Sequence, residues 1–322
     1  MSDVARFVCV DWGTSRLRAT LCEYADGDAT VRQRLSGPGI KNVRDSVEKA
    51  LFDVIASWVQ DYGEIPILLA GAVGSNIGWR NTPYLSCPFA VDDLPLHCTE
   101  FTARGSDIVI IPGLECTNSF GEPDTMRGEE LQILGWLRED ETRLQRTHLV
   151  CLPGTHTKWV TLEGGRVKSF QSAVTGELYA LISEHSILLA HNVERAVDAS
   201  FEDEAFALGV NACRAARGSL SHTLFSVRSR ILTRQLSTGA AASFLSGVLV
   251  TADVMGALEL LGEFSETIAL IGEPTLCAHF ASVLETFGLS SEIADGNNAA
   301  TRGFSVVYRD RLLRAQQRSV SA

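Results

Sequence analysis

With 322 residues and a mass of 34.9 kDa, the chain is longer than one ordinary domain, and its 45% hydrophobic and 21% charged residues exclude a disordered protein. A net charge of −11 argues against a nucleic-acid-binding protein, which usually presents a basic face. Scattered cysteines without a C-x-x-C pair, no signal-peptide pattern and no uninterrupted apolar run of about 18 residues predict a cytoplasmic protein without a membrane partner.

The first half of the chain has the pattern of an α/β layer, in which three strands are followed by a helix and then by further strands. The helix has apolar residues at helical spacing, with Asp45 or Ser46 as its N-cap. The continuous apolar runs after the helix are typical of parallel strands that are buried on both faces. The predicted strands are residues 6–10, 17–23, 29–35, 65–70 and 108–111, and the predicted helix is 45–62.

The second half resembles the first. Gly154 corresponds to Gly13 at an offset of 141 residues, and similar elements follow both glycines. We therefore expect two related α/β domains, at 1–123 and 124–322, each of which opens with a hairpin around a Gly-Thr turn. The predicted strands are 148–152, 159–162, 167–172, 268–271 and 291–294, and the predicted helices are 176–192, 203–217, 240–262, 274–287 and a terminal helix that can pack back on the first domain.

The sequence Asp-Trp-Gly-Thr-Ser at residues 11–15 lies between the first two predicted strands. A tight Gly-Thr turn exposes successive backbone N–H groups that can bind phosphate oxygens, and the hydroxyls of Thr14 and Ser15 add donors. Asp11, at the end of the strand, is placed to hold Mg²⁺, usually through water. The alternative is an ordinary hairpin turn in which the aspartate caps backbone groups.

A second turn, Pro-Gly-Thr-His-Thr-Lys at residues 153–158, occupies the corresponding place in the second half. Two such turns can hold a triphosphate, with Lys158 nearby as a positive charge, whereas His156 is either a phosphate ligand or an exposed residue without a role. Gly272 ends an apolar run where an adenine ring could lie against the backbone. The candidate nucleotide-binding residues are Gly13, Thr14, Ser15, Gly154, Thr155, His156, Lys158 and Gly272.

A glycine-rich loop at residues 71–79 leaves a buried strand, which is a common position for a ligand. Ser75 and Asn76 can bind hydroxyl or carboxyl groups, and Trp79 and Tyr84 can form the wall of a pocket. The alternative is a structural Ω-loop without a ligand.

Two adjacent glutamates, Glu129 and Glu130, lie in the first turn of a predicted helix. The helix dipole favours ionised carboxylates there, and an ionised carboxylate that reaches a substrate hydroxyl can act as the base in phosphoryl transfer. Adjacent side chains on a helix point about 100° apart, so we expect only one of the two to enter a site. The alternative is that both only cap and solvate the helix.

In chain order, these motifs resemble the 2-dehydro-3-deoxygalactonokinase family. The most specific segments are Met-Arg-Gly-Glu-Glu at residues 126–130 and Pro-Gly-Thr-His at residues 153–156, whereas Asp-x-Gly-Thr is shared with sugar kinases, Hsp70 and actin. The resemblance covers nearly the whole chain. It implies an α/β fold of two ribonuclease-H-like (actin-like ATPase) domains, with a cleft for Mg-ATP between them, and phosphorylation of the 6-hydroxyl of a 2-keto-3-deoxy sugar acid.

The resemblance also implies roles for individual residues. Glu129, which follows Gly128, stands where related sugar kinases carry an acidic base, usually an aspartate, and Glu130 and Asp124 stay open as alternatives. Asp11 would hold Mg²⁺. The expected substrate-binding residues are Ser75, Asn76, Trp79, Tyr84 and Arg127.

The sequence therefore predicts an ATP- and Mg²⁺-dependent kinase for 2-dehydro-3-deoxy-D-galactonate in galactonate catabolism. One alternative is a kinase for another sugar acid or a neutral sugar. Another is an actin- or Hsp70-like nucleotide-sensing ATPase, which is disfavoured because no peptide-binding domain follows the second unit. The expected partners are ATP and a small sugar acid, without nucleic acid or membrane, and a homodimer stays open.

Overall fold

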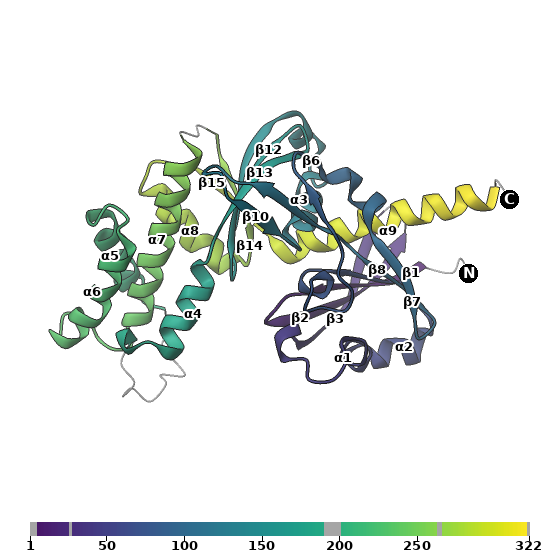
Figure 1. Cartoon of the computed structure of the whole chain (residues 1–322), viewed down its shortest axis with the longest axis horizontal. Coiled ribbons are helices and arrows are strands. Elements are labelled where there is room, and N and C mark those ends of the chain that lie inside the picture. The colour runs from purple at the N-terminus through teal and green to yellow at the C-terminus, as the bar shows by residue number, and fades with distance from the viewer. Residues whose placement is uncertain (1–4, 26–27, 190–200, 263–265, 321–322) are drawn as a thin grey trace. The chain divides into compact units, whose positions relative to one another are not determined.

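The computed structural model describes residues 5–25, 28–189, 201–262 and 266–320 (Figure 1). Contacts between Cα atoms divide the chain into two compact units. This grouping assigns residues 124–147 to the first unit, whereas the sequence predicted a boundary between residues 123 and 124. Unit 1 comprises Met1–Thr147, Thr161–Phe170 and Ala294–Ala322, and unit 2 comprises His148–Val160 and Gln171–Ile293.

A six-stranded mixed sheet forms the centre of unit 1. Its strands are β1 (Ala5–Trp12), β2 (Arg16–Ala25), β3 (Asp28–Pro38), β4 (Ile67–Ala70), β7 (Thr99–Ala103) and β8 (Ser106–Ile110). The strand order is β3-β2-β1-β4-β8-β7, in which β1, β2 and β3 form the predicted antiparallel meander. β4 pairs in parallel with both β1 and β8, so the carboxyl ends of these three strands lie at the same edge of the sheet.

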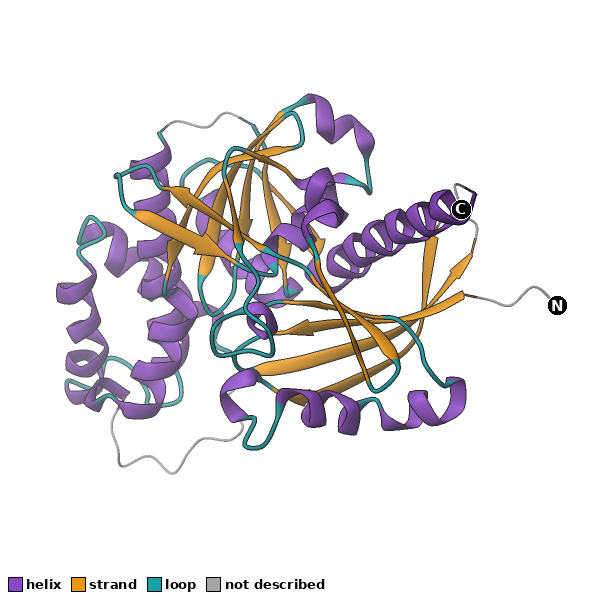
Figure 2. Cartoon of the chain, turned by 45° about the vertical axis from the view of Figure 1, so that its right-hand side comes forward, coloured by secondary structure: helices purple, strands orange, loops and turns teal. Residues whose placement is uncertain are grey.

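Helices cover both faces of this sheet (Figure 2). α1 (Val47–Val54) and α2 (Ala56–Tyr62) pack on the face that carries Val8 and Val10. On the other face lies α9 (Gly296–Val320), where the rings of Tyr308 and Phe7 stack with their centroids 4.1 Å apart. A further α-helix of this unit, α3 (Glu129–Leu137), packs along α9.

The helix that the sequence predicted over residues 45–62 is divided in two. Ser46 caps its start as expected, because its hydroxyl accepts a hydrogen bond from the backbone N–H of Lys49 (3.1 Å). Ile55 leaves the helical conformation and ends α1 while it begins α2. Ile55 is fully buried, so the break lets its side chain fill the core between the two helices and the sheet.

Unit 1 also contains a small sheet that the sequence did not predict. Its order is β10-β9-β5, and these short strands lead the chain toward the start of α3. The strands of this small sheet are β5 (Tyr84–Ser86), β9 (Gly113–Thr117) and β10 (Pro123–Met126). The other short elements of the unit are β6 (Phe89–Ala90) and the 3₁₀ helices η1 (Ile40–Asn42), η2 (Ala72–Gly74), η3 (Val91–His97) and η4 (Glu141–Gln145).

The second half of the chain contributes five strands to another sheet. They are β11 (Thr147–Leu152), β12 (Thr157–Glu163), β13 (Arg166–Ala173), β14 (Ile268–Gly272) and β15 (Ser291–Asp295). The full order is β15-β14-β11-β12-β13-β6. The series β13-β12-β11-β14-β15 repeats the order β3-β2-β1-β4-β8 of the first sheet, which supports the predicted relation between the two halves.

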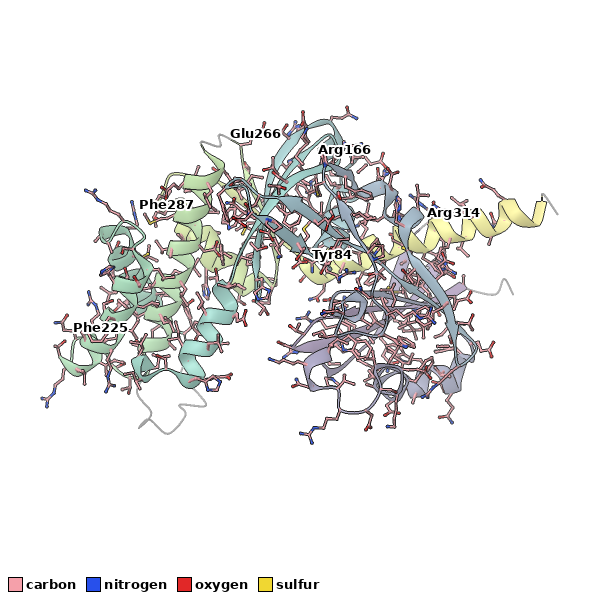
Figure 3. The ribbon with its side chains drawn as sticks, in the orientation of Figure 1. Tyr84, Arg166, Phe225, Glu266, Phe287 and Arg314 are labelled. Atoms are coloured by element: carbon pink, nitrogen blue, oxygen red, sulfur yellow. The ribbon has the colours of Figure 1, made fainter. Side chains whose placement is uncertain are left out.

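Helices make up most of the remainder of unit 2. The helix α6 (Leu220–Leu232) was not predicted, because serines and arginines interrupt its apolar pattern. Residues 190–192, the end of the predicted helix 176–192, lie outside the described residues. The helices are α4 (Thr175–His185), η5 (Ile187–Leu189), α5 (Asp203–Ala215), α6 (Leu220–Leu232), α7 (Ala241–Leu261) and α8 (Pro274–Glu285). Phe225 of α6 is exposed at the surface of this unit (Figure 3).

α7 is long and apolar enough to cross a membrane by length and composition, although its sequence lacks an uninterrupted apolar run. Half of its most apolar stretch of 18 residues is buried within the protein. There α7 packs against α4, α5, α6 and α8. Its hydrophobicity is therefore explained by its place as the central helix of unit 2.

Glycines allow α5 and α7 to approach until their backbones touch. A Cβ added at Gly247 of α7 would lie 2.2 Å from the carbonyl oxygen of Phe206, and one added at Gly209 of α5 would lie 2.2 Å from that of Phe244. In unit 1, Gly135 of α3 and Gly303 of α9 make the same kind of reciprocal approach.

Gly256 of α7 differs from Gly247, because a Cβ added there would meet no atom of the described residues within 4 Å. Glycine in a helix interior is less stable than alanine by about 1 kcal/mol. We expect Gly256→Ala to raise the free energy of unfolding by about 0.5–1 kcal/mol, and Gly247→Ala to lower it by about 1–3 kcal/mol through overpacking. Urea denaturation of both variants checks this pair, and a loss of stability at Gly256 would contradict the open space beside it.

Candidate active site

Asp11 lies at the end of β1, opposite Arg18 on β2. Its Oδ2 accepts a hydrogen bond from Arg18 Nη1 (3.1 Å), and a Cβ added at Gly71 would lie 3.5 Å from its Oδ1. Loss of hydration raises the pKa of Asp11, and the charge of Arg18 opposes this shift. The sequence analysis did not single out Arg18. Its position opposite Asp11 follows from the register of the β1–β2 hairpin.

The surroundings of Asp11 fit Mg²⁺ bound mainly by water and phosphate. Among the described residues, no group of three or more acidic, histidine or cysteine side chains could hold a metal ion by itself. Mg²⁺ keeps several waters and is commonly bound through one or two carboxylates plus substrate phosphates, so a single carboxylate is sufficient.

The first predicted phosphate turn is held by the start of η1. The backbone N–H groups of Ile40 and Lys41 donate to the carbonyls of Gly13 (3.1 Å) and Thr14 (3.2 Å). Thr14 and Ser15 are exposed, so their hydroxyls face the surface of unit 1. The turn is therefore fixed through its carbonyls, while its side chains stay accessible.

The glycine-rich loop after β4 uses some of its predicted ligand residues for its own structure. The Ser75 hydroxyl donates to the carbonyl of Ala72 (2.7 Å), which closes the turn η2. Trp79 packs edge-on against Phe101 (5.0 Å between ring centroids) at the margin of the hydrophobic core. Asn76 is the exposed polar residue of this group, so it is the side chain most available to a ligand.

Arg127 is held rigidly between β5 and the start of α3. Its Nη2 donates to the carbonyl of Thr82 (2.9 Å), its Nη1 donates to the Thr82 hydroxyl, and its guanidinium lies 4.2 Å from the ring centroid of Tyr84. A Cβ added at Gly74 would lie 2.9 Å from Nη1. Two of the predicted substrate residues, Arg127 and Tyr84, therefore lie together and adjoin the glycine-rich loop.

Glu129 and Glu130 open α3 in different environments. Glu129 is half-buried, and its Oε2 accepts a hydrogen bond from the backbone N–H of Arg127 (2.9 Å). Glu130 is fully buried, and both of its oxygens lie 2.8 Å from the backbone nitrogen of Gly128. Burial, followed by the neighbouring charge of Glu129, raises the pKa of Glu130 to about 8. Glu130 thus faces the packed side of the helix.

The raised pKa of Glu130 predicts a pH-dependent stability. Because its pKa rises from the usual 4.5 to about 8 on folding, the native state binds more protons than the unfolded state between these values. Stability should fall as the pH rises through this window. Glu130→Gln mimics the protonated acid, so we expect its melting temperature to vary less between about pH 5 and pH 8. Parallel melting curves for the two proteins across this range would contradict the buried acid.

Gly71 and Gly128 bring these elements together within unit 1. A Cβ added at Gly128, whose φ of +113° favours glycine, would lie 3.5 Å from the Cα of Gly71. Gly71 in turn adjoins Asp11. The start of α3 therefore lies beside the carboxyl ends of β1 and β4, which is where open α/β sheets usually bind ligands. The third candidate carboxylate, Asp124, lies on β10 and accepts a hydrogen bond from the backbone N–H of Thr125 (2.8 Å).

In unit 2, the second predicted phosphate turn is held by the start of α4. The backbone N–H of Glu177 donates to the carbonyl of Thr155 (2.9 Å), and a Cβ added at Gly176 would lie 2.3 Å from the carbonyl oxygen of Gly154. His156 is exposed, and its Nε2 lies 2.7 Å from Glu177 Oε2. The turn therefore presents an oriented imidazole at the surface of this unit.

Lys158 and Gly272 take different places around this turn. Lys158 is buried, and its Nζ donates to Ser172 Oγ (2.5 Å), so its ammonium group is engaged on the sheet rather than exposed at the turn. Gly272 lies beside the turn, because a Cβ added there would be 3.2 Å from the carbonyl oxygen of Pro153. The structure thus brings Gly272 and the turn together.

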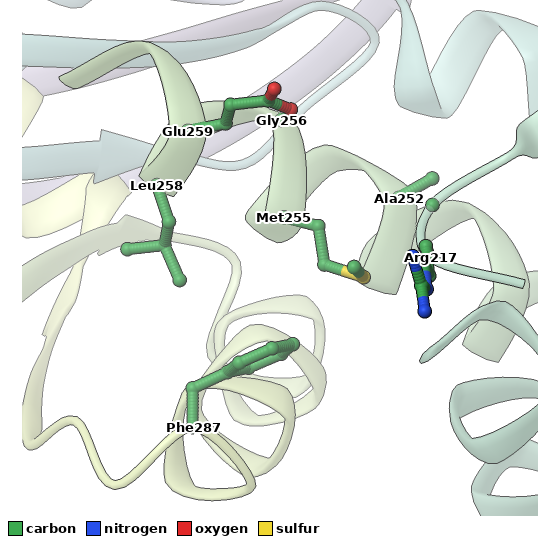
Figure 4. Close-up of a pocket in the computed structure, with 8 residues that line it drawn as sticks. Arg217, Ala252, Met255, Gly256, Leu258, Glu259 and Phe287 are labelled. Carbon is green, nitrogen blue, oxygen red and sulfur yellow. The ribbon is translucent and has the colours of Figure 1, made fainter. Parts of the chain in front are cut away.

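One hollow of unit 2 is lined by none of the candidate site residues. It has a volume of about 320 Å³ and is formed by the second half of α7 together with Arg217 and Phe287 (Figure 4). A smaller hollow of about 150 Å³ in unit 1 is lined by Asp11, Arg18 and Arg34. The chemistry of its lining, and not its size, makes the smaller hollow part of the candidate site.

Comparisons with known proteins identify the family. A family model described as 2-keto-3-deoxy-galactonokinase matches residues 11–307. The chain is 31% identical over 309 residues to a Rhizobium meliloti (strain 1021) protein described as a probable 2-dehydro-3-deoxygalactonokinase, covering 96% of this chain and 98% of that protein. It is 30% identical over 300 residues to the Escherichia coli (strain K12) 2-dehydro-3-deoxygalactonokinase, covering 93% and 96%.

Solved structures agree with this result. A crystal structure from Sinorhizobium meliloti, assigned as a 2-dehydro-3-deoxygalactonokinase, matches with a TM-score of 0.80 and 30% identity, covering 94% of this chain and 98% of that one. The Clostridium difficile activator of 2-hydroxyisocaproyl-CoA dehydratase, with bound ADPNP, shares only the fold, with a TM-score of 0.52, 9% identity and 97% coverage of both chains. The predicted actin-like α/β fold is confirmed. The chain belongs to the 2-dehydro-3-deoxygalactonokinase family.

Proposed function

We propose that this protein transfers the γ-phosphoryl group of ATP to the 6-hydroxyl of 2-dehydro-3-deoxy-D-galactonate, giving 2-dehydro-3-deoxy-6-phosphogalactonate and ADP. The family match over residues 11–307 carries the proposal. The grouping of Asp11, Gly71 and Glu129 in one unit supports it, because a kinase needs a metal-binding carboxylate and a base near each other.

Glu129 is the proposed base. Its carboxylate is oriented by the backbone N–H of Arg127, and it would accept the proton of the substrate hydroxyl as that oxygen attacks the γ-phosphorus. The bond between this phosphorus and the bridging oxygen breaks, and ADP leaves with the electron pair. Glu130 cannot serve equally well, because it is buried against the backbone of Gly128.

Asp11 would hold Mg²⁺ through water, and the bound ion would neutralise charge on the phosphates. The Arg18 guanidinium donates a hydrogen bond to one oxygen of this carboxylate. Gly13, Thr14 and Ser15 would contribute backbone and hydroxyl donors to phosphate oxygens, because their turn is braced and its side chains are exposed.

The second turn would bind phosphate through Gly154, Thr155 and His156, with Gly272 beside the adenosine. His156 would contact phosphate while the carboxylate of Glu177 orients its ring. Lys158 would act at longer range, because its ammonium group is buried at Ser172. These roles all fall to residues of unit 2.

The sugar acid would bind next to the glycine-rich loop. Asn76 is exposed for a hydroxyl, and Arg127 with Tyr84 forms a rigid cationic group suited to the substrate carboxylate. Ser75 and Trp79 would contribute mainly by holding the shape of this loop. We also propose a cytoplasmic location, where its eight cysteines, which are all free thiols, remain reduced. Whether the protein forms a homodimer is left to measurement of its oligomeric state.

A substrate panel tests the proposal. The purified protein is incubated with ATP, Mg²⁺ and either 2-keto-3-deoxy acids of different stereochemistry or neutral hexoses, and phosphorylated product is measured together with ADP. We expect product only with 2-keto-3-deoxy acids, and most with the galactonate-derived acid. ADP release that is independent of any sugar would instead favour a nucleotide-sensing ATPase.

A further inference from the structure

One buried carboxylate in unit 2 has no role in the reaction described above. Asp253 is the single charged residue of α7 between Ala241 and Leu258, it is 7% exposed, and within the described chain it forms no ion pair. An unpaired carboxylate is costly to bury, and burial raises the pKa of Asp253. An apolar side chain would stabilise this central helix better, so packing alone does not explain the aspartate.

Both oxygens of Asp253 are used, each by a different element. Oδ1 accepts a hydrogen bond from the indole Nε1–H of Trp159 on β12 (2.8 Å). Oδ2 accepts one from the hydroxyl of Thr175, the first residue of α4 (2.5 Å). Trp159 is itself fully buried. One carboxylate therefore joins α7, β12 and α4.

These two partners belong to the elements that hold the second phosphate turn. β12 begins at Thr157, directly after the turn. The start of α4 contacts the turn at two places, through the hydrogen bond from Glu177 N–H to the Thr155 carbonyl and the close approach of Gly176 to Gly154. A shift of either element would therefore displace the backbone groups of the turn.

We propose that Asp253 is a positioning residue that fixes the second phosphate turn, residues 153–156, for binding the phosphates of ATP. The inference rests on the proposed function only in that this turn binds nucleotide. A site must be held within about 0.5 Å of its working geometry by the residues behind it, and a buried two-armed acceptor meets that need. An apolar residue at position 253 would stabilise α7 but would leave the indole and the hydroxyl without an acceptor.

Asp253→Leu removes both arms while keeping the same number of side-chain heavy atoms in the same branched arrangement. We expect the dissociation constant for ATP, measured by calorimetry without sugar acid, to rise about 10- to 100-fold, as displaced site groups typically cause. The KM for the sugar acid should stay close to that of the wild type. Asp253→Asn should restore most of the affinity, because its oxygen accepts from Trp159 and the Thr175 hydroxyl can reverse its role and accept from the amide.

Val254→Ala is the matched control, because Val254 is a fully buried neighbour in α7 within the core of unit 2. It should lower the melting temperature without changing the affinity for ATP. Thr175→Val, which keeps Asp253 and removes one arm, provides a milder variant if Asp253→Leu does not fold, and it should weaken ATP binding by a smaller factor. ATP affinities of Asp253→Leu or Thr175→Val equal to that of Val254→Ala would overturn the proposal.

The readout is independent of the proposed reaction. If the wild-type protein binds ATP but phosphorylates none of the acids in the panel, the proposed substrate is wrong while the role of Asp253 is still measured. If phosphorylation proceeds and Asp253→Leu leaves ATP binding intact, the role of Asp253 is wrong and the reaction stands.

Discussion

Asp11→Asn should abolish turnover while the fold stays intact. A neutral amide binds a Mg²⁺-linked water poorly, and a bound metal ion contributes several kcal/mol to phosphoryl transfer, so we expect kcat to fall at least about 10³-fold. The lost ion pair with Arg18 is partly exposed and contributes less than about 1 kcal/mol to stability. The melting temperature should therefore change little. Steady-state kinetics at saturating Mg²⁺ provide the measurement.

Arg18→Gln is the control for this result. It removes the same ion pair but keeps the carboxylate, so its kcat should stay far above that of Asp11→Asn. An Asp11→Asn variant with an unchanged kcat at saturating Mg²⁺ would remove Asp11 from the metal site. Equal losses in both variants would instead assign the effect to the ion pair.

Glu129→Gln should lower kcat by about 10²–10⁴-fold, the usual contribution of a general base, with little change in the affinity for ATP. The amide is nearly isosteric, and its oxygen can still accept the hydrogen bond from the Arg127 N–H, so the start of α3 should keep its shape. Single-turnover phosphorylation of the sugar acid separates this chemical step from product release.

Glu130→Gln is the matched control, since it makes the same change one residue further along the helix. Glu130 is fully buried against Gly128, so we expect a much smaller loss of kcat than at Glu129. A greater loss at Glu130 would exchange the two roles. If neither variant loses activity, the base lies elsewhere, and Asp124 on β10 is the next residue to test.

Strands and turns with strong local patterns were predictable from the sequence. The meander β1–β3, the buried strands β4 and β14 and the cap at Ser46 lie where the apolar runs and the capping residue placed them. The corresponding order of strands in the two sheets could be expected from two similar series of elements. These features depend on residues that are close in the chain, so a local reading is sufficient.

Features that depend on distant contacts were missed. The small sheet β10-β9-β5 has strands of three to five residues, too short to show an alternation, and is formed by pairing rather than by propensity. α6 has serines and arginines within its apolar pattern, and it packs against α7. The break at Ile55 falls within a regular apolar pattern, and only the shape of the core places it there.

For the candidate site, the sequence identified motifs but not their orientation. It placed Lys158 near the second phosphate turn as a positive charge for the triphosphate, whereas its position in β12 turns the side chain into the protein. It left open which of Glu129 and Glu130 is the base. In the structure, the tight start of α3 at Gly128 leaves Glu129 half-buried and Glu130 fully buried. Arg18 and Asp253 depend on cross-strand register and helix packing, and a lone charge in the apolar α7 was the one signal for Asp253.

The order of segments in unit 1 has a consequence for synthesis on the ribosome. Its sheet is translated before unit 2, but α9 is translated after it. At 5–20 residues per second, residue 294 follows residue 147 by about 7 to 30 s. Until then, the sheet face of Phe7 and Tyr24, which Tyr308 covers in the finished protein, has no helix from its own unit to bury it. Unit 1 is thus begun first and completed last, and this apolar face lacks its covering helix while unit 2 is being synthesised.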